Sequence, residues 1–349
     1  MKTDFLIIGG GAVGMSSAIV LLQAGFKVTL LERGTTGAEA SWAGGGILSP
    51  LCSWDYTDSV TNLTERSMGM FEKTTAVLFD ATGIDTEYQK SGMLLLPPYQ
   101  DQIATAWCKA HQVALQHVAL DTHIPGMQGS GLFMPHIAQV RNPRLLQALR
   151  RRVEMLGGAI FEQHEVQRFE IQGDRISSLQ TSKENISADA YIVAAGAWSR
   201  TLLGEHAMGM EVRPIRGQIL LFKFDVPPFS TILLQNNLYF IPRRDGHVLV
   251  GSTLEDVGFD KTTTNEARAY LLQRVHALFP NWQQPVRHWA GLRPGSPDNI
   301  PTIGRHPAID NLYANCGHFR YGVTMSLASA ELLLDAIEGR AAGEYRWRE

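Results

Sequence analysis

A glycine-rich turn near the N-terminus constrains the fold more than any other feature of the sequence. The apolar run Phe5–Ile8 leads directly into Gly9-Gly10-Gly11-Ala12-Val13-Gly14, and an apolar segment with helical spacing follows. A strand, G-x-G-x-x-G and helix in this order are typical of dinucleotide-binding folds. The glycines permit a tight turn, a close approach to a pyrophosphate and close packing of helix on strand. We therefore predict a Rossmann-like unit at the start of the chain.

A second strand-like run, Lys27–Leu31, ends at Glu32, whose carboxylate can accept hydrogen bonds from ribose hydroxyls. The motif alone does not distinguish NAD from FAD. Two further turns rich in small residues, at 40–47 and 192–199, favour FAD because they let the backbone pass close to a cofactor. The segment 316–322 leads into a predicted helix, whose N-terminal end can stabilise negative charge on a reduced flavin.

The order of strand-like and helical segments predicts an interrupted nucleotide domain. The length of 349 residues is compatible with about two domains. Segments typical of the nucleotide unit come from both ends of the chain, while the middle contains runs of alternating polarity that favour an antiparallel sheet. The predicted strands are Phe5–Ile8, Lys27–Leu31 and Tyr191–Ala194, the helices Ala12–Leu22, Ser59–Phe79 and Tyr321–Ile337, and the alternating runs Gly217–Phe224, Leu238–Pro242 and His247–Gly251.

The predicted fold class is therefore α/β, or α+β overall, with two interleaved domains. A discontinuous Rossmann-like FAD-binding domain is expected at 1–88, 137–212 and 295–349. A substrate-binding domain built on an antiparallel sheet is expected at 89–136 and 213–294.

Composition narrows the partners and the location. Thirty-one basic and 34 acidic residues leave a net charge of −3, which favours neither a nucleic acid nor an anionic membrane surface as a partner. The three cysteines form no metal, redox or disulfide pattern, and the histidines show no metal-ligand spacing, so we expect no metal. The N-terminus lacks the apolar region of a signal peptide, and no apolar run approaches the roughly 20 residues of a membrane span. We expect a cytoplasmic protein.

Five further segments carry a resemblance to a known family. They are Arg216-Gly217-Gln218, Tyr239–Gly246, Val250–Thr253, Trp289–Asp298 and Gly317–Arg320. With the glycine-rich turns, they make nearly the whole chain resemble the D-amino-acid oxidase superfamily of flavoproteins, and within it the glycine oxidases of thiamine biosynthesis. No second G-x-G-x-x-G is present, which argues against NAD(P)H as an electron donor.

The resemblance implies oxidative deamination of glycine or another small amino acid, such as sarcosine or a small D-amino acid. A hydride would pass from Cα to flavin N5, giving an imine and, with O2, hydrogen peroxide; the imine could enter thiazole synthesis. Non-covalent FAD and a homo-oligomer are also implied. The implied FAD contacts are Gly9, Gly11, Ala12, Val13, Gly14, Glu32, Arg33, Ser41, Trp42, Ala43, Gly44, Gly45, Gly46, Val166, Ala195, Gly196, Trp198, Gly217, Arg293, Gly317, His318, Phe319, Arg320, Tyr321 and Gly322.

Three residues are implied at the substrate. Arg293 matches the arginine that binds the substrate carboxylate, a task suited to a guanidinium because it donates two parallel hydrogen bonds. Tyr239 matches a tyrosine whose hydroxyl also contacts the carboxylate, and Arg320 matches a second arginine near the flavin. The chain departs from the glycine-oxidase pattern at Leu254, Tyr321 and Asn237, and we expect these departures to affect substrate preference.

Three other interpretations stay open at this stage. The same fold could pass electrons to a quinone or an electron-transfer protein, as D-amino-acid and sarcosine dehydrogenases do. An NAD-dependent dehydrogenase would also contain the first motif. A catalytically inactive FAD-binding module is disfavoured because Arg293, Tyr239 and Arg320 are all present.

Overall fold

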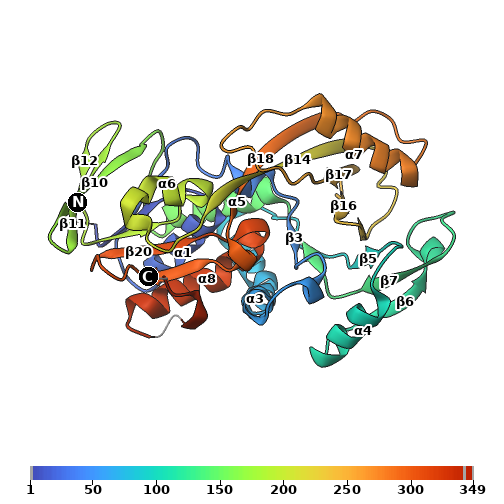
Figure 1. Cartoon of the computed structure of the whole chain (residues 1–349), viewed down its shortest axis with the longest axis horizontal. Helices are drawn as coiled ribbons and strands as arrows, with labels where there is room; N and C mark the ends of the chain where they lie inside the picture. Colours follow the sequence, from blue (N-terminus) through green and yellow to red (C-terminus); the bar gives the residue numbers. More distant parts are fainter. Residues whose placement is uncertain (1–2, 341–342, 348–349) are drawn as a thin grey trace.

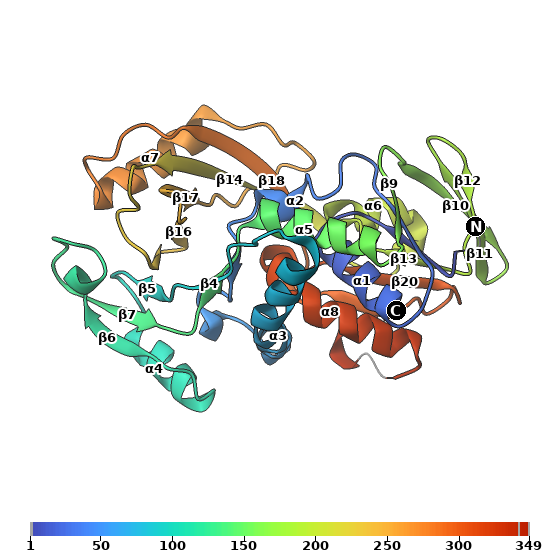
Figure 2. The same cartoon turned by 180° about the vertical axis from the view of Figure 1, so that it is seen from behind.

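The computed structural model describes residues 3–340 and 343–347. Residues 1–2, 341–342 and 348–349, which belong to the predicted FAD-binding domain, lie outside this description. The two views in Figures 1 and 2 show an elongated molecule. Helices α1, α3, α5 and α8 gather at its centre, and the long strands β14 and β18 lead away toward a second, sheet-rich part.

The first part is built on a six-stranded, mainly parallel sheet. Strand β1 lies between β13 and β2 and pairs with both in parallel, so the carboxyl ends of the three strands meet at one edge. Only β19 runs antiparallel to its neighbour. In sheet order the strands are β19 (Thr302–Arg305), β20 (Leu312–Cys316), β13 (Ala190–Val193), β1 (Phe5–Ile8), β2 (Val28–Leu31) and β9 (Ala159–Phe161).

Both faces of this sheet are covered. Phe5 and Ile7 pack into the cluster formed with α1, α3, α5 and α8, whereas Leu6 and Ile8 pack into a second cluster with β10 and β11. All four β1 residues are therefore buried and apolar, as a parallel strand between two layers requires. The helices of the chain are α1 (Ala12–Gln23), α2 (Ala40–Ala43), α3 (Asp58–Thr82), α4 (Asp101–Ala110), α5 (Asn142–Met155), α6 (Ser199–Leu203), α7 (Asn265–Leu278) and α8 (Gly322–Ile337).

The second part is an eight-stranded sheet that is antiparallel except at one pair. Strands β5 and β15 run parallel, and the other pairs of the sheet are antiparallel, as predicted from the alternating runs. In sheet order the strands are β18 (Arg287–Gly295), β14 (Arg213–Lys223), β17 (His247–Gly251), β16 (Leu238–Pro242), β15 (Ile232–Gln235), β5 (Met93–Leu95), β7 (Ser130–Met134) and β6 (Gln116–Ala119).

Two small sheets complete the described chain. One covers the six-stranded sheet, and the other contains β3, which follows the 40–47 turn directly. Strands of the two large sheets fall on the two sides of the predicted domain division, and the domain boundaries themselves remain a prediction. The small sheets are β10 (Val166–Gln172), β11 (Arg175–Thr181) and β12 (Asn185–Ile186), and β3 (Ile47–Leu48), β8 (Ala138–Gln139) and β4 (Gln89–Lys90).

The predicted segments all appear at their expected places, with ends that shift by at most a few residues. Strand β1 has the predicted bounds, β2 begins one residue later, and α8 begins at Gly322 after a short 3-10 turn, η6 (Phe319–Tyr321). Within the described residues, no helix is both long and apolar enough to span a membrane.

The turn between β1 and α1 depends on two glycines that touch. Gly9 has φ +115°, and a Cβ on Gly14 would lie 2.0 Å from the Gly9 carbonyl oxygen. We predict that Gly14→Ala lowers the free energy of unfolding by about 1–3 kcal/mol, because the added methyl forces the turn and helix apart. The matched change is Gly69→Ala in α3, where nothing lies within 4 Å and alanine should stabilise the helix by about 0.5–1 kcal/mol. Denaturant unfolding at a fixed FAD concentration measures both, and equal effects would contradict the prediction.

Candidate active site

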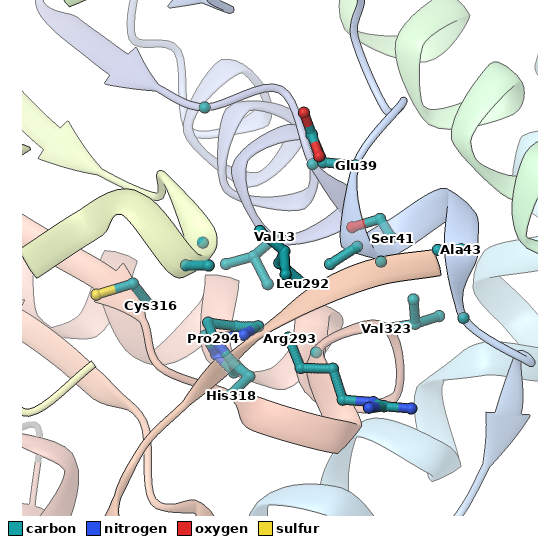
Figure 3. A pocket seen from close by; sticks show the side chains of 18 of the residues that line it. Val13, Glu39, Ser41, Ala43, Leu292, Arg293, Pro294, Cys316, His318 and Val323 are labelled. Atoms are coloured by element: carbon teal, nitrogen blue, oxygen red, sulfur yellow. The ribbon is translucent and has the colours of Figure 1, made fainter. Parts of the chain in front are cut away.

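A deep cavity of about 600 Å³ opens where the two large sheets meet. Its wall includes the carboxyl ends of β1, β2 and β13 on one side and residues of β14, β16 and β18 on the other. Figure 3 shows β18 crossing this space, with Leu292 directed toward Val13 of α1 and the Arg293 side chain extending to the opposite side of the strand. The volume lies within the roughly 300–1,000 Å³ typical of small-molecule and cofactor sites.

The nucleotide end of the cavity contains a carboxylate held in a fixed orientation. Glu32 is 8% exposed; its Oε2 accepts a hydrogen bond from the Gly10 N–H (2.8 Å) and its Oε1 from the Gly34 N–H (2.9 Å). Each carboxylate oxygen keeps a free lone pair, since it accepts one backbone donor here. Glu32 can therefore accept hydrogen bonds from a ribose at the position that the motif predicts.

A cation and an indole ring form the neighbouring wall. The Cζ atom of Arg33 lies 3.5 Å from the ring centroid of Trp198, and Arg33 Nη2 lies 2.9 Å from Glu39 Oε1. All three residues line the cavity. Trp198 ends a short 3-10 turn, η3 (Gly196–Trp198), so the small residues before it bring the ring next to the cofactor space.

The glycine loop at 44–46 is held by two side chains that the sequence analysis did not assign. Asn142 Nδ2 donates to the carbonyl oxygens of Ser41 (2.7 Å) and Gly44 (3.0 Å). Arg243, which is 5% exposed, donates to the carbonyl oxygens of Gly45 (2.6 Å) and Val140 (2.9 Å). Burial lowers the pKa of Arg243 to about 10, so its guanidinium remains charged at neutral pH.

Three buried polar atoms on the cavity wall have no hydrogen-bond partner among the described residues: Asn142 Oδ1, Asn315 Oδ1 and His318 Nε2. Buried polar atoms in native proteins nearly always have a partner, so these atoms fit a bound molecule that supplies both donors and acceptors. The dinucleotide turn, the oriented Glu32 carboxylate and these three atoms together fit an FAD molecule.

His318 is a neutral side chain in this setting. It is 1% exposed, and burial lowers the pKa of its imidazole to about 3. Cys316, which also lines the cavity, is kept as a thiol because burial raises its pKa to about 12. Neither side chain supplies charge at neutral pH.

The part of the cavity formed by β14, β16 and β18 contains Arg293. Its guanidinium donates to the Ser252 hydroxyl and the Thr253 carbonyl oxygen, and no carboxylate of the described residues forms an ion pair with it. Burial lowers its pKa from the ordinary value, and the charge of Arg320 adds to this effect, while Tyr239 raises it. Gly217 makes the arrangement possible, because a Cβ there would lie 2.1–2.3 Å from the guanidinium atoms.

Tyr239 and Arg320 both line the same cavity. Tyr239 lies on β16 and is 8% exposed. Arg320 lies on η6, and its Cζ is 5.7 Å from the Phe319 ring centroid. No carboxylate of the described chain forms an ion pair with Arg320. The cavity therefore holds two guanidinium groups without an acidic partner.

Of the three departures from the glycine-oxidase pattern, only Tyr321 lines the cavity. Tyr321 is 3% exposed, its hydroxyl bonds that of Tyr56, and the two rings lie 5.2 Å apart. Leu254 is 53% exposed, and Asn237 is an exposed residue in the turn between β15 and β16 with φ +64°. Both side chains therefore lie on the surface and outside the cavity wall, and their effect on substrate preference stays a prediction.

The structure brings nearly all of the implied contact residues to one cavity. Ala12, Gly14 and Trp42 are the ones that do not line it. Ala12 donates its N–H to Ser41 Oγ (3.0 Å), Gly14 contacts Gly9, and the Trp42 ring packs on Trp289. Wall residues that the sequence analysis did not name include Glu39, Ser49, Leu51, Asn142, His164, Ser252, Asn315 and Thr324.

Comparison with known proteins places this geometry in a family. The family model described as DAO, FAD dependent oxidoreductase, matches residues 4–336. The chain belongs to the FAD-dependent oxidoreductase family. FAD is therefore its cofactor, which excludes the interpretation as an NAD-dependent dehydrogenase.

The relatives are similar over nearly the whole chain. Glycine oxidase of Pseudomonas aeruginosa is 41% identical over 97% of this chain and 96% of that protein. The bifunctional protein ThiO/ThiG of Trichormus variabilis is 32% identical over 97% of this chain and 53% of that protein. Among solved structures, glycine oxidase from Bacillus cereus has a TM-score of 0.89 at 27% identity and covers 97% of this chain and 95% of its own.

We predict that Gly11→Val removes FAD from the purified protein. A Cβ on Gly11 already lies 3.1 Å from Ser41 Oγ, and the two methyl groups of valine would occupy the space where a pyrophosphate approaches the helix start. Acid precipitation provides the measurement. Wild type should release yellow flavin into the supernatant, since attachment is predicted to be non-covalent, and Gly11→Val should release almost none. A yellow Gly11→Val protein, or flavin that stays in the wild-type pellet, would contradict these predictions.

His318 gives a prediction about pH. Its folded-state pKa of about 3 lies below the ordinary 6.5, so the unfolded chain binds the proton first as pH falls below 6.5. This residue therefore destabilises the fold between about pH 6.5 and 3, and has no effect above that window. His318→Asn should reduce the loss of unfolding free energy on acidification by about 1 kcal/mol per pH unit, measured between pH 6 and 5. An unchanged slope would contradict the lowered pKa, since it would mean that the folded and unfolded chains bind this proton alike.

Proposed function

We propose that this flavoprotein oxidises glycine or another small amino acid, such as sarcosine or a small D-amino acid, to the imine, with O2 as electron acceptor and hydrogen peroxide as product. One observation carries the proposal: the Arg293 guanidinium lines the cavity with neutral acceptors on one edge and no ion-pair partner among the described residues. An unpaired buried cation needs an anion, and a planar guanidinium matches a carboxylate. The names of the relatives support an amino acid as the molecule that carries this carboxylate.

Each residue around the cavity has its own role in the proposed reaction. Arg293 binds the substrate carboxylate through two parallel hydrogen bonds, and the Tyr239 hydroxyl donates to the same group. Bound FAD supplies the acceptor for the two electrons that leave the substrate. Arg320 adds positive charge near the mouth, where it favours an anionic substrate and a reduced cofactor. His318 is not needed as a base, because its neutral imidazole is buried and removal of a hydride requires no proton acceptor at Cα.

The physiological setting belongs to the same proposal. The similarity to the ThiO/ThiG protein favours a role in thiamine biosynthesis, in which the imine would enter thiazole formation. Non-covalent FAD, a homo-oligomeric state and a cytoplasmic location complete it.

An anaerobic substrate screen tests the proposal. Glycine, sarcosine, D-alanine, D-proline and larger D- and L-amino acids are each mixed with the FAD-loaded protein, and the rate of flavin bleaching is measured. Small substrates without a bulky L side chain should bleach the flavin fastest. Faster bleaching by a large L-amino acid would overturn the substrate assignment. Admission of O2 should then yield peroxide at the rate of turnover, whereas its absence would point to a dehydrogenase that uses another acceptor.

We predict that Arg293→Ala lowers kcat/KM for the preferred amino acid by roughly 30-fold to several thousand-fold. Removal of one partner of a buried charge pair costs about 2–5 kcal/mol, because the carboxylate is left desolvated and unpaired. Arg293→Lys should recover part of the loss, since an ammonium keeps the charge without the two-pronged contact. Arg175→Ala, at an exposed position on β11, is the matched control and should leave kcat/KM unchanged.

A second substrate makes the Arg293 result specific. An amine without a carboxylate should be a poor substrate for wild type and should lose little in Arg293→Ala. Equal losses for both substrates would show that Arg293 supports the fold or the cofactor instead.

A further inference from the structure

Arg293 donates hydrogen bonds to one segment, Ser252–Thr253, directly after β17, and the Tyr239 hydroxyl is a further polar neighbour of its guanidinium. One guanidinium nitrogen donates to the Ser252 hydroxyl, and the other terminal nitrogen donates to the Thr253 carbonyl oxygen (3.3 Å). Gly217 lies against the guanidinium from β14. The group is therefore held along one edge by two neutral acceptors and against one side by backbone.

We propose that Ser252 and Thr253 are positioning residues for the substrate carboxylate, acting through Arg293, and that a buried ion-pair network on β14 holds them in place. This inference rests on the proposed function, because it assumes that Arg293 binds the carboxylate. Neutral acceptors suit this task. They orient the Arg293 guanidinium by hydrogen bonds and leave its other donors and its charge for the substrate. A carboxylate at the same place would compete with the substrate for the guanidinium.

Both the backbone and the side chain of Thr253 are hydrogen-bonded to β14. Its Oγ1 accepts the Gln218 N–H (2.8 Å), and its own N–H donates to the Gln218 carbonyl oxygen (3.3 Å). The same hydroxyl donates to Glu255 Oε1. Gln218 is fully buried, and its side-chain amide also donates to Glu255 (3.0 Å). The carbonyl that faces Arg293 therefore has little freedom to move.

Glu255 in turn is held by Arg216, which is 4% exposed. Glu255 Oε2 lies 2.7 Å from Arg216 Nη2, and two backbone hydrogen bonds of 2.8 and 2.9 Å join the same residues. Burial by itself would raise the pKa of Glu255, but hydrogen bonds from Thr253, Arg216 and Gln218 lower it. Asp260 pairs with the other Arg216 nitrogen (2.6 Å). Both carboxylates of the network thus pair with Arg216 and neither forms an ion pair with Arg293, which stays available to a ligand.

The experiment measures the binding of acetate, a carboxylate that has no amino group to be oxidised. Acetate is titrated into the FAD-loaded protein, and its Kd is taken from the change in flavin absorbance. Ser252→Ala should raise this Kd by roughly tenfold, the scale of one hydrogen bond to a charged group. Thr253→Val should raise it several-fold, and Thr253→Ser, which keeps the hydroxyl, should stay within about twofold of wild type. Flavin content and Tm should be unchanged, and the Thr253 pair decides the question if Ser252→Ala does not fold.

A double-mutant cycle separates positioning from direct contact. Ser252→Ala is combined with Arg293→Ala, and kcat/KM for the preferred amino acid is measured in all four proteins. If Ser252 acts through Arg293, it should change kcat/KM less than about twofold once Arg293 is absent. An equal effect in both backgrounds would mean that Ser252 contacts the substrate itself, which overturns the inference, as would an unchanged acetate Kd in Ser252→Ala. Failure of Arg293→Ala to weaken acetate binding would instead overturn the proposed carboxylate site.

Discussion

The cavity depends on close backbone contact between the glycine loop and the eight-stranded sheet. A Cβ on Gly291 would lie 2.5 Å from Ala43 Cβ, and a Cβ on Gly45 would lie 2.5 Å from Ile241 Cδ1. Only glycine permits approaches this close without displacing its neighbours. The Trp289 indole N–H, which donates to the Ala43 carbonyl (3.1 Å), then fixes the spacing of the two parts. The nucleotide end and the substrate end become one cavity because of these contacts.

Two arginines near this junction, Arg243 and Arg293, differ in the groups that they contact and therefore in their roles. Arg243 directly follows β16 and Arg293 lies on β18, two strands of the same sheet that are separated by β14 and β17, and burial lowers the pKa of each. Arg243 places both terminal nitrogens on Gln139 and on the carbonyls of Val140 and Gly45, and so holds the glycine loop. Arg293 donates to Ser252 and Thr253 on one edge, and it lines the cavity. The two guanidinium groups therefore differ in position, because the terminal nitrogens of Arg243 are used within the protein whereas Arg293 reaches the cavity.

The local elements of the fold could be predicted from the sequence, and the long-range contacts could not. The spacing of apolar residues and the residues of the turns predicted β1, α1, α3 and α8, since both patterns involve residues that are close in the sequence. The parallel pairing of β5 with β15 joins residues about 140 positions apart, and no local pattern reports it. Asn142 and Arg243 hold the glycine loop from about 100 and 200 positions along the chain, respectively. Leu254 and Asn237 lie one or two residues outside the motif segments, but closeness in sequence to a motif does not give the direction of a side chain.

Tyr321 is therefore the one noted departure that can act on the pocket from its wall. Its hydroxyl bonds Tyr56, which follows a short 3-10 turn at Ser53–Asp55, and its ring is buried. Burial raises the pKa of Tyr321, so the phenol stays neutral and its contribution is shape rather than charge. A rigid ring beside Arg320 reduces the volume open to a substrate side chain. Under the proposed function, Arg293 selects the class of substrate through its carboxylate, whereas selection among amino acids by size falls to the neutral wall at Tyr321, whose position Tyr56 helps to hold.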